Sequence, residues 1–222
     1  MKFQNAERTD SMIPMKEFYE KQANTIIKHL EKRNMSGYYC PDSSSAVDKA
    51  LSLIENDSIV SWGGSMSLKE SGVIDALKKA PVTLLDRANA QSPEEAQAIY
   101  RKAFSADYYL MSSNAITLDG QLVNIDGNGN RVAALTFGPA HVILVVGMNK
   151  VTKTVEEALD RVHNAAAPPN AVRLGSDTPC GRTGVCADCL SPGCLCAQVL
   201  VTRYSRIPGR IHVILVGESL GY

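Results

Sequence analysis

The sequence predicts an α/β fold: a mostly parallel, twisted sheet with helices on both faces and some antiparallel strands. Short apolar runs alternate with amphipathic segments along most of the chain. In the run 141–146, the residues after His141 are continuously apolar, as expected for a strand covered on both faces of a parallel sheet. Asp119-Gly120 separates two short apolar runs, which is a hairpin signal and requires local antiparallel pairing.

The first half of the chain follows this alternation. Residues 1–13 are polar and are expected to form an N-terminal arm, and Pro14 suits the first turn of a helix whose apolar residues recur at three- and four-residue steps. Ser92 and Pro93 form a second strong helix start. The expected helices are 14–33, 43–54, 65–79 with an interruption near Gly72, and 92–105; the expected strands are 38–40, 59–62, 82–85 and 107–111.

The second half contains the hairpin, a helix at 131–137, the apolar strand 141–146 and a helix at 154–166 that Pro168-Pro169-Asn170 is expected to stop. Strands at 198–204 and 210–216 close the chain, and we expect them to add antiparallel pairing. Residues 14–222 are predicted to form a single domain that includes a cysteine-rich segment, 178–196.

Composition narrows the function classes. The chain has 222 residues, with 23 basic and 23 acidic side chains and no basic block that would follow a nucleic-acid backbone, so no nucleic-acid partner is expected. No apolar run is long enough to span a membrane, and the N-terminus lacks a hydrophobic signal region. We therefore expect a cytoplasmic protein with no membrane partner; the sequence gives no oligomeric state.

The most informative stretch is 112–131. The strand 122–125 leads into Asp126-Gly127-Asn128-Gly129-Asn130, a loop of residues that make tight turns and let backbone N–H groups approach a ligand. Arg131 follows at a predicted helix start, where a guanidinium group and a helix N-terminus both attract a carboxylate or phosphate. The alternative is an ordinary surface turn with a solvated arginine.

A second turn, Gly63-Gly64-Ser65, links a strand to a helix and is a candidate anion-binding turn, although neither the P-loop nor the dinucleotide fingerprint is present. An ordinary strand-to-helix turn is the alternative. In parallel sheets, ligands bind beyond the carboxyl ends of the strands, so this turn, Asn114 and the loop before Arg131 are expected to converge. The predicted ligand-binding residues are Gly63, Gly64, Ser65, Asn114, Thr117, Asn124, Gly127, Asn128, Gly129, Asn130 and Arg131, with Asp126 as a candidate general base.

Five of the six cysteines lie within 17 residues. Cys186 and Cys189 form a C-x-x-C pair, flanked by Cys180 and Cys196, and four thiolates suit zinc or an iron–sulfur cluster. Cys194 is an alternative fourth ligand. Free or disulfide-linked thiols are the competing interpretation, and the spacing does not decide between zinc and iron–sulfur.

Together these stretches resemble the lactate-utilisation (LUD) domain family of bacteria, over about residues 14–222. The matching motifs are Gly63-Gly64-Ser65-Met66, Ser113-Asn114-Ala115-Ile116-Thr117 with Asp119-Gly120, the stretch from Asn124 to Arg131, Gly147-Met148-Asn149-Lys150, the cysteine run with Ser191-Pro192, and the stretch from Gly209 to Val216. The pattern departs from the family at Cys194, where a charged residue is more usual.

The resemblance implies a fold related to sugar-phosphate isomerases and coenzyme A transferases. Some members of the family belong to a multi-protein system that oxidises L-lactate with iron–sulfur partners. The first hypothesis is therefore an accessory in lactate or hydroxy-acid oxidation. In this role Arg131 would clamp a carboxylate, and Asn114 and Thr117 would hydrogen-bond a hydroxyl. The competing hypothesis is an enzyme or sensor that binds a phosphorylated sugar or a coenzyme A thioester and uses its cysteines as a structural zinc site. A regulatory subunit without catalysis is a third.

Overall fold

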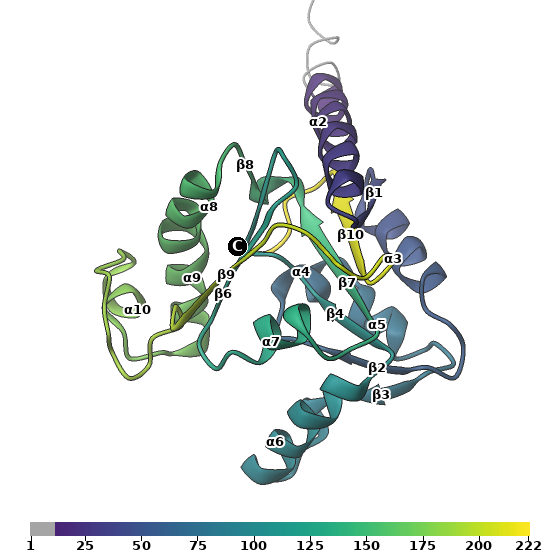
Figure 1. The fold of residues 1–222 in the computed structure, drawn as a ribbon. Helices are drawn as coiled ribbons and strands as arrows, with labels where there is room; N and C mark the ends of the chain where they lie inside the picture. Colours follow the sequence, from purple (N-terminus) through teal and green to yellow (C-terminus); the bar gives the residue numbers. More distant parts are fainter. Residues whose placement is uncertain (1–11) are drawn as a thin grey trace, which may run out of the picture.

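The computed structural model describes residues 12–222 and is built on a six-stranded sheet in which all neighbouring strands are parallel (Figure 1). Along the sheet the strands are β1 (Ser36–Cys40), β10 (Ile211–Val216), β7 (His141–Gly147), β4 (Tyr108–Met111), β2 (Ile59–Trp62) and β3 (Thr83–Leu85). The predicted α/β class is confirmed, and the continuously apolar β7 lies inside the sheet between β10 and β4.

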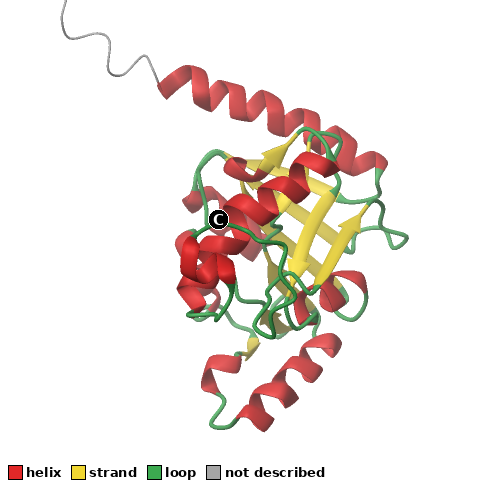
Figure 2. Cartoon of the chain, turned by 90° about the vertical axis from the view of Figure 1, so that its left-hand side faces the viewer, coloured by secondary structure: helices red, strands yellow, loops and turns green. Residues whose placement is uncertain are grey.

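Two apolar cores lie on opposite faces of this sheet, because successive strand residues point in opposite directions. Val142, Leu144 and Val146 of β7 belong to one core, while Ile143 and Val145 belong to the other. The first core includes residues of α2 (Met12–Lys32) and α7 (Asn130–Thr136), and the second includes residues of α3 (Ser43–Ser52), α4 (Met66–Glu70) and α5 (Val73–Leu77). Both α2 and α6 (Pro93–Lys102) extend beyond the sheet (Figures 1 and 2).

A second, mixed sheet has the order β8 (Val151–Thr152), β5 (Ala115–Thr117), β6 (Leu122–Asp126) and β9 (Gln198–Thr202). The predicted hairpin is confirmed: β5 and β6 are antiparallel, and Gly120 takes the positive φ, +82°, that its turn requires. One face of this sheet joins the core beneath α2, and the other packs on α8 (Val155–Arg161).

Two predictions need correction. The closing strands were expected to add antiparallel pairing: β9 does so, with β6, whereas β10 lies parallel between β1 and β7. Pro168-Pro169 does not stop a helix. A π-helical turn, Val162–Ala166, leads from α8 into α9 (Ala167–Leu174), whose first turn contains both prolines. Proline is tolerated there because first-turn N–H groups have no partner inside the helix.

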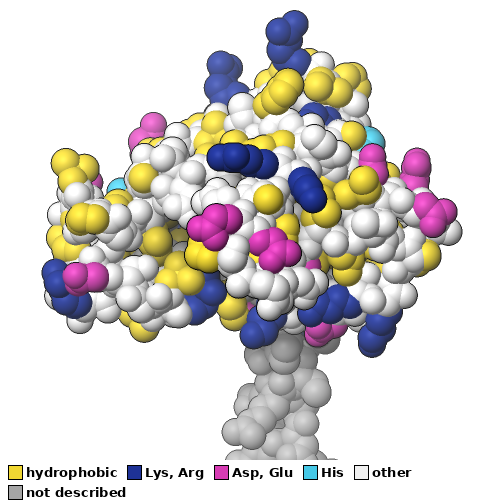
Figure 3. All heavy atoms as spheres, turned by 90° about the horizontal axis from the view of Figure 1, so that it is seen from below, with side chains coloured by type: hydrophobic (Ala, Val, Ile, Leu, Met, Phe, Trp, Pro, Cys, Tyr) yellow, Lys and Arg dark blue, Asp and Glu magenta, His cyan; other side chains and the backbone are white. Residues whose placement is uncertain are grey.

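Residues 1–11 of the expected N-terminal arm lie outside the described residues, while Met12 and Ile13 already belong to α2. Within residues 12–222, no helix has both the length and the apolar composition needed to cross a membrane. On the face shown in Figure 3, basic and acidic side chains are interspersed among apolar ones.

Candidate functional site

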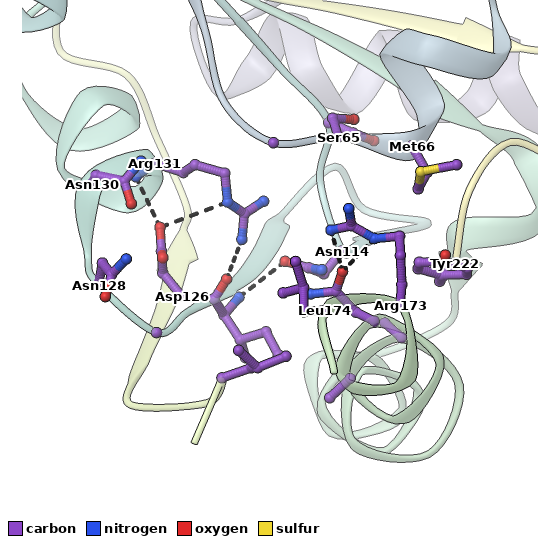
Figure 4. A pocket seen from close by; sticks show the side chains of 18 of the residues that line it. Ser65, Met66, Asn114, Asp126, Asn128, Asn130, Arg131, Arg173, Leu174 and Tyr222 are labelled. Carbon is purple, nitrogen blue, oxygen red and sulfur yellow. Dashed lines mark hydrogen bonds and ion pairs between the residues drawn. The ribbon is translucent and has the colours of Figure 1, made fainter. Parts of the chain in front are cut away.

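A cavity of about 390 Å³ lies at the carboxyl ends of the central parallel strands. The turn after β2, the segment after β4, the loop between β6 and α7 and the turn after β7 all reach it, as the topology of a parallel sheet requires. Residues of α9, of the cysteine-rich segment and of the C-terminus complete its lining. Figure 4 shows Arg173 of α9 and Tyr222 across the cavity from Asp126 and Arg131.

Most of the predicted ligand-binding residues line this cavity. They are Gly64, Ser65, Asn114, Gly127, Asn128, Asn130 and Arg131, together with the candidate base Asp126. Four do not: Gly63, Thr117, Asn124 and Gly129. Gly63 follows β2, Asn124 lies in β6, Gly129 precedes α7, and Thr117 belongs to the hairpin between β5 and β6.

Thr117 belongs to the hairpin. Its hydroxyl is fully buried and donates to the carboxylate of Asp119, which also pairs with Arg33. Burial alone would raise the pKa of Asp119, but the Thr117 hydroxyl and the Arg33 charge together hold it below its ordinary value. The roles of Thr117 and Asp119 are therefore explained by the turn between β5 and β6.

Asn124 holds two strands at the cavity edge. Its Oδ1 accepts the backbone N–H of Asn114 at 3.3 Å, and Asn114 Oδ1 in turn accepts the backbone N–H of Ile125 at 3.1 Å. Among the described residues, Asn124 Nδ2 is buried without a hydrogen-bond partner. This exchange fixes the Asn114 side chain at the edge of the cavity.

The glycines after β2 allow two arginines to approach the chain. A Cβ atom on Gly63 would lie 2.7 Å from the Arg131 side chain, and one on Gly64 would lie 2.7 Å from Arg87 Nη2. Both distances are shorter than real Cβ contacts, so a side chain at either position would displace the arginine. The Gly-Gly pair therefore sets where these two guanidinium groups lie.

Asp126 and Arg131 form one unit at the start of α7. Asp126 is 6 % exposed, and its Oδ2 accepts the backbone N–H groups of Arg131 at 2.8 Å and Val132 at 3.2 Å. Arg131 Nε lies 3.7 Å from the same oxygen, and its Nη2 donates to the carbonyl of Ile125 (Figure 4). Asp126 thus fixes both the helix start and the arginine.

Three further basic groups at the cavity were not predicted from the sequence. Arg87 donates to the Tyr100 hydroxyl at 2.7 Å, and Arg173 donates to Asn170 Oδ1 at 2.7 Å. Lys150, in the short turn after β7, is 4 % exposed. Only Lys150 had a sequence signal, because it ends the Gly-Met-Asn-Lys motif after an apolar strand. Within residues 12–222, none of the three has a carboxylate within 4.0 Å.

Lys150 is held by hydroxyl groups. Its Nζ lies 2.7 Å from Ser67 Oγ and 3.1 Å from Ser112 Oγ. Burial, and then the charges of Arg161 and Arg131, lower the pKa of Lys150 from 10.5 to about 7, while Glu70 opposes this shift. The cavity therefore contains an amine that is partly neutral near physiological pH.

The cysteine-rich segment forms one wall of the cavity through Pro192, Gly193, Cys194 and Leu195. It packs closely on the loop that follows β6, because a Cβ atom on Gly127 would lie 3.3 Å from the Cys194 carbonyl oxygen. The segment includes α10 (Pro179–Thr183), and Thr178 caps this helix by accepting the N–H of Gly181. From residue 179 to 196 every side chain is at least partly exposed.

The predicted metal ligands are free thiols in this segment. Cys186 Sγ lies 3.5 Å from His163 Nδ1 and 3.5 Å from the Asp188 N–H, and Cys194 Sγ accepts the Cys196 N–H at 3.3 Å. Hydrogen bonding to Ser191 lowers the pKa of Cys189. In the part of the chain that the structure describes, no three His, Cys, Asp or Glu side chains are arranged closely enough to hold an ion.

The pKa of Cys196 is strongly raised. Burial raises its pKa to about 12, and the charges of Cys194, Cys186 and Cys180 add to the effect. Cys40, by contrast, lies in the core at the end of β1. A donor set of several thiols beside one imidazole has the chemistry that zinc and iron–sulfur clusters require.

The comparisons concern the whole fold. The chain resembles the crystal structure of a DUF162 family protein from Deinococcus radiodurans, with 15% sequence identity, a TM-score of 0.50, and coverage of 89% of this chain and 98% of that one. It also resembles eIF2B delta from Chaetomium thermophilum at 21% identity and a TM-score of 0.34, over 53% of this chain and 50% of that one. No curated protein matches the chain significantly.

The sequence of residues 23–216 matches the family described as the LUD domain. This range includes the main sheet, the second sheet and the cysteine-rich segment. The resemblance inferred from the sequence motifs is thereby confirmed, and the chain belongs to the LUD domain family.

Proposed function

We propose that this LUD domain binds a small anionic metabolite, through a carboxylate or phosphate group, in the cavity at the carboxyl ends of the strands. One observation supports this above the others. The described lining has four basic side chains, Arg87, Arg131, Lys150 and Arg173, and one acidic side chain, Asp126. Asp126 is already bonded to α7, so it neutralises the cavity only in part.

Such an excess of positive charge in a partly enclosed space attracts anions strongly, because the protein around it is less polarisable than water. The cavity volume of about 390 Å³ lies in the range of small-molecule sites, roughly 300–1,000 Å³. A small acid or a sugar phosphate fits this space. We do not expect the whole of coenzyme A to fit, so a thioester would place only its acyl end here.

In the first candidate role, the ligand is a hydroxy or keto acid and the chain is an accessory in lactate or hydroxy-acid oxidation. Arg131 binds the carboxylate with the N–H groups that Ile125 and Asp126 leave free, and Asn114 contacts the hydroxyl. Asp126 is the candidate base through Oδ1, because Oδ2 accepts two backbone N–H groups. In the second role, the same cations bind the phosphate of a phosphorylated sugar.

Calorimetric titration separates these roles. The purified chain is titrated with pyruvate, L-lactate, inorganic phosphate, ribose 5-phosphate and coenzyme A. We expect one class to bind, and Arg87→Gln and Arg173→Gln each to weaken that binding by about tenfold, as for the loss of one charged partner. Arg101→Gln is the matched control, because Arg101 lies on the exposed face of α6 and does not line the cavity.

Two results would overturn the proposal. One is the absence of binding by every anion in the panel at millimolar concentration. The other is equal weakening by Arg101→Gln and by the two cavity variants. Preference for pyruvate or lactate would support the hydroxy-acid role, and preference for ribose 5-phosphate would support the sugar-phosphate role.

We also propose that the cysteine-rich segment binds a metal centre, either zinc or an iron–sulfur cluster, with Cys180, Cys186, Cys189 and Cys196 as ligands and Cys194 as the alternative. The supporting observations are the five cysteines within 17 residues and the backbone N–H groups that Cys186 and Cys194 accept, as the sulfurs of metal-bound thiolates commonly do. Zinc would stabilise the segment, whereas an iron–sulfur cluster would exchange electrons with iron–sulfur redox proteins.

Metal analysis and a visible spectrum of protein purified without oxygen test this second proposal. Iron with inorganic sulfide would support the redox role, and one equivalent of zinc would support a structural site. Cys189→Ser should abolish metal binding, whereas Cys40→Ala, a change far from the segment, should leave it intact. Protein free of metal after reconstitution with both zinc and iron plus sulfide would contradict the proposal.

A further inference from the structure

We propose that Lys150 is the reactive amine of the cavity and forms an imine with the carbonyl carbon of the anionic ligand. This inference rests on the anion-binding function proposed above and narrows its ligand class to aldehydes and ketones that also have a carboxylate or phosphate. The candidate ligands are therefore keto acids and phosphorylated open-chain sugars. Lys150 would then react with the ligand as a catalytic residue, as well as contribute positive charge to the cavity.

The position of Lys150 is the first argument. It ends the short turn Met148–Lys150 directly after β7, and it lines the cavity although only 4 % of the residue is exposed. The same cavity is lined by Arg131 and Arg173, which would hold the anionic end of a ligand. An amine that is buried, yet borders a space with fixed cations, can contact the uncharged end of that ligand.

The hydrogen bonds around Nζ are the second argument. Ser67 Oγ donates to the Leu220 carbonyl at 3.1 Å, and Ser112 Oγ donates to the Ser113 carbonyl at 3.3 Å. Both hydroxyl hydrogens are thus used, so each serine oxygen must accept an N–H from Lys150. Two N–H groups therefore hold the nitrogen in place, and its remaining position faces the cavity. That position is a hydrogen in the ammonium form and the lone pair in the amine form.

The surrounding charges are the third argument. Within residues 12–222 no carboxylate lies within 4.0 Å of Nζ. The charged groups that act on it are Arg161 and Arg131, which disfavour the ammonium form, and Glu70, which favours it. A lysine whose task was only to bind anions would keep its charge, whereas these surroundings release the lone pair that a nucleophile needs.

The reaction balances without another reactant. The Nζ lone pair attacks the carbonyl carbon, the carbon–oxygen π electrons move to oxygen, and one proton passes from nitrogen to that oxygen to give a carbinolamine. The hydroxyl group then leaves as water with a second proton, and the nitrogen lone pair forms the carbon–nitrogen double bond. Amine and carbonyl thus give imine and water, with no change in oxidation state.

Reductive trapping tests the inference on the wild-type chain. The protein is incubated with pyruvate or with glyceraldehyde 3-phosphate, reduced with sodium borohydride and mapped by peptide mass spectrometry. We expect saturable labelling at Lys150, in preference to exposed lysines such as Lys102 and Lys153. Lys150→Arg should remove this label, Lys153→Arg should leave it, and saturating inorganic phosphate should reduce it by about tenfold by occupying the cations.

Because the label is located on the wild-type protein, the result does not depend on the folding of a variant. Calorimetric titration with the same probes separates two kinds of failure. Binding that depends on Arg173 without any label at Lys150 would overturn the imine and leave the anion site standing. Absence of both binding and label would overturn both proposals, and labelling of Lys150 no faster than of Lys153 would also overturn the imine.

Discussion

The cavity lining and the cysteine-rich segment that closes it are built in opposite ways. Asp126 and Lys150 are buried and are held by hydrogen bonds from elements that belong to the sheets and their helices. In the cysteine-rich segment, Val185 is 65 % exposed and Leu190 is fully exposed, and turns and one helix cap provide most of the order.

This difference indicates different origins of stability. The cavity groups are fixed by the folded sheets themselves, so the free energy of unfolding depends on them. The segment buries little apolar surface, so apolar packing contributes little to its order, and a metal–thiolate centre would add a strong link between its residues. Substitutions in the two regions should therefore differ in size and in kind.

The largest expected effect concerns Asp126. Asp126→Ala should lower the free energy of unfolding by about 2–4 kcal/mol, because it leaves two backbone N–H groups and the Arg131 guanidinium without their acceptor. Asp126→Asn keeps an acceptor oxygen and should cost clearly less. Urea denaturation measures both values; an equal cost for the two variants would show that hydrogen-bond acceptance by Asp126 does not matter.

The next effect is the pH dependence that Lys150 confers. Its pKa is about 7 in the folded chain and 10.5 in the unfolded one, so between these values the unfolded chain binds more protons and stability rises with pH. Below about pH 7 both states are charged and the full penalty of the buried ammonium group is present.

Lys150→Met removes this dependence. Relative to the wild type, the variant should be more stable at pH 6.5 than at pH 9 by about 2–3 kcal/mol. Urea denaturation at the two pH values measures this change, and Lys153→Met, at an exposed position on the same connection, serves as the control. If the difference in the free energy of unfolding between variant and wild type stays constant with pH, the lowered pKa of the buried Lys150 amine is contradicted.

Local sequence signals predicted the parts of the fold that depend on neighbouring residues. The hairpin at Asp119-Gly120 and the buried strand β7 follow from a turn dipeptide and an apolar run. The strands that pair with β9 and β10 could not be predicted in this way, because pairing over long sequence distances leaves no local pattern. Pro168 illustrates a further ambiguity, since proline is compatible both with the end of one helix and with the first turn of the next.

The residues of the candidate site also differ in whether a local sequence signal predicts them. The loop from Asp126 to Arg131 could be predicted because its glycines and asparagines are contiguous with a strand end. Arg87 and Arg173 could not, because each is an isolated basic residue far along the chain, and only the topology brings them to one cavity. Lys150 stood in a visible motif, but its burial beside two serines depends on β7, α4 and the segment after β4.

A smaller effect should distinguish ligand binding from stability within the cavity. Gly64→Ala places a methyl group against Arg87 Nη2, so it should weaken the binding of whichever probe anion binds best by about three- to tenfold, roughly 1 kcal/mol. Stability should change little, because Gly64 is exposed and the end of an arginine can move. In an Arg87→Gln background the same substitution should have no further effect on affinity, and full additivity of the two would show that Gly64 does not act through Arg87.

The smallest effect is expected at the start of the cysteine-rich segment, where Asp177 precedes it and Arg182 belongs to it. Asp177 pairs with Arg182 at 2.7 Å, but the two side chains are 86% and 65% exposed, so solvent and salt screen the pair. Asp177→Ala should change the free energy of unfolding by less than about 0.5 kcal/mol at low and at high salt alike. A loss as large as that of Asp126→Ala would mean that surface charges hold the segment. A negligible loss of stability, together with faster proteolysis of residues 178–196 after treatment with a chelator, would show that thiol-bound metal orders the segment.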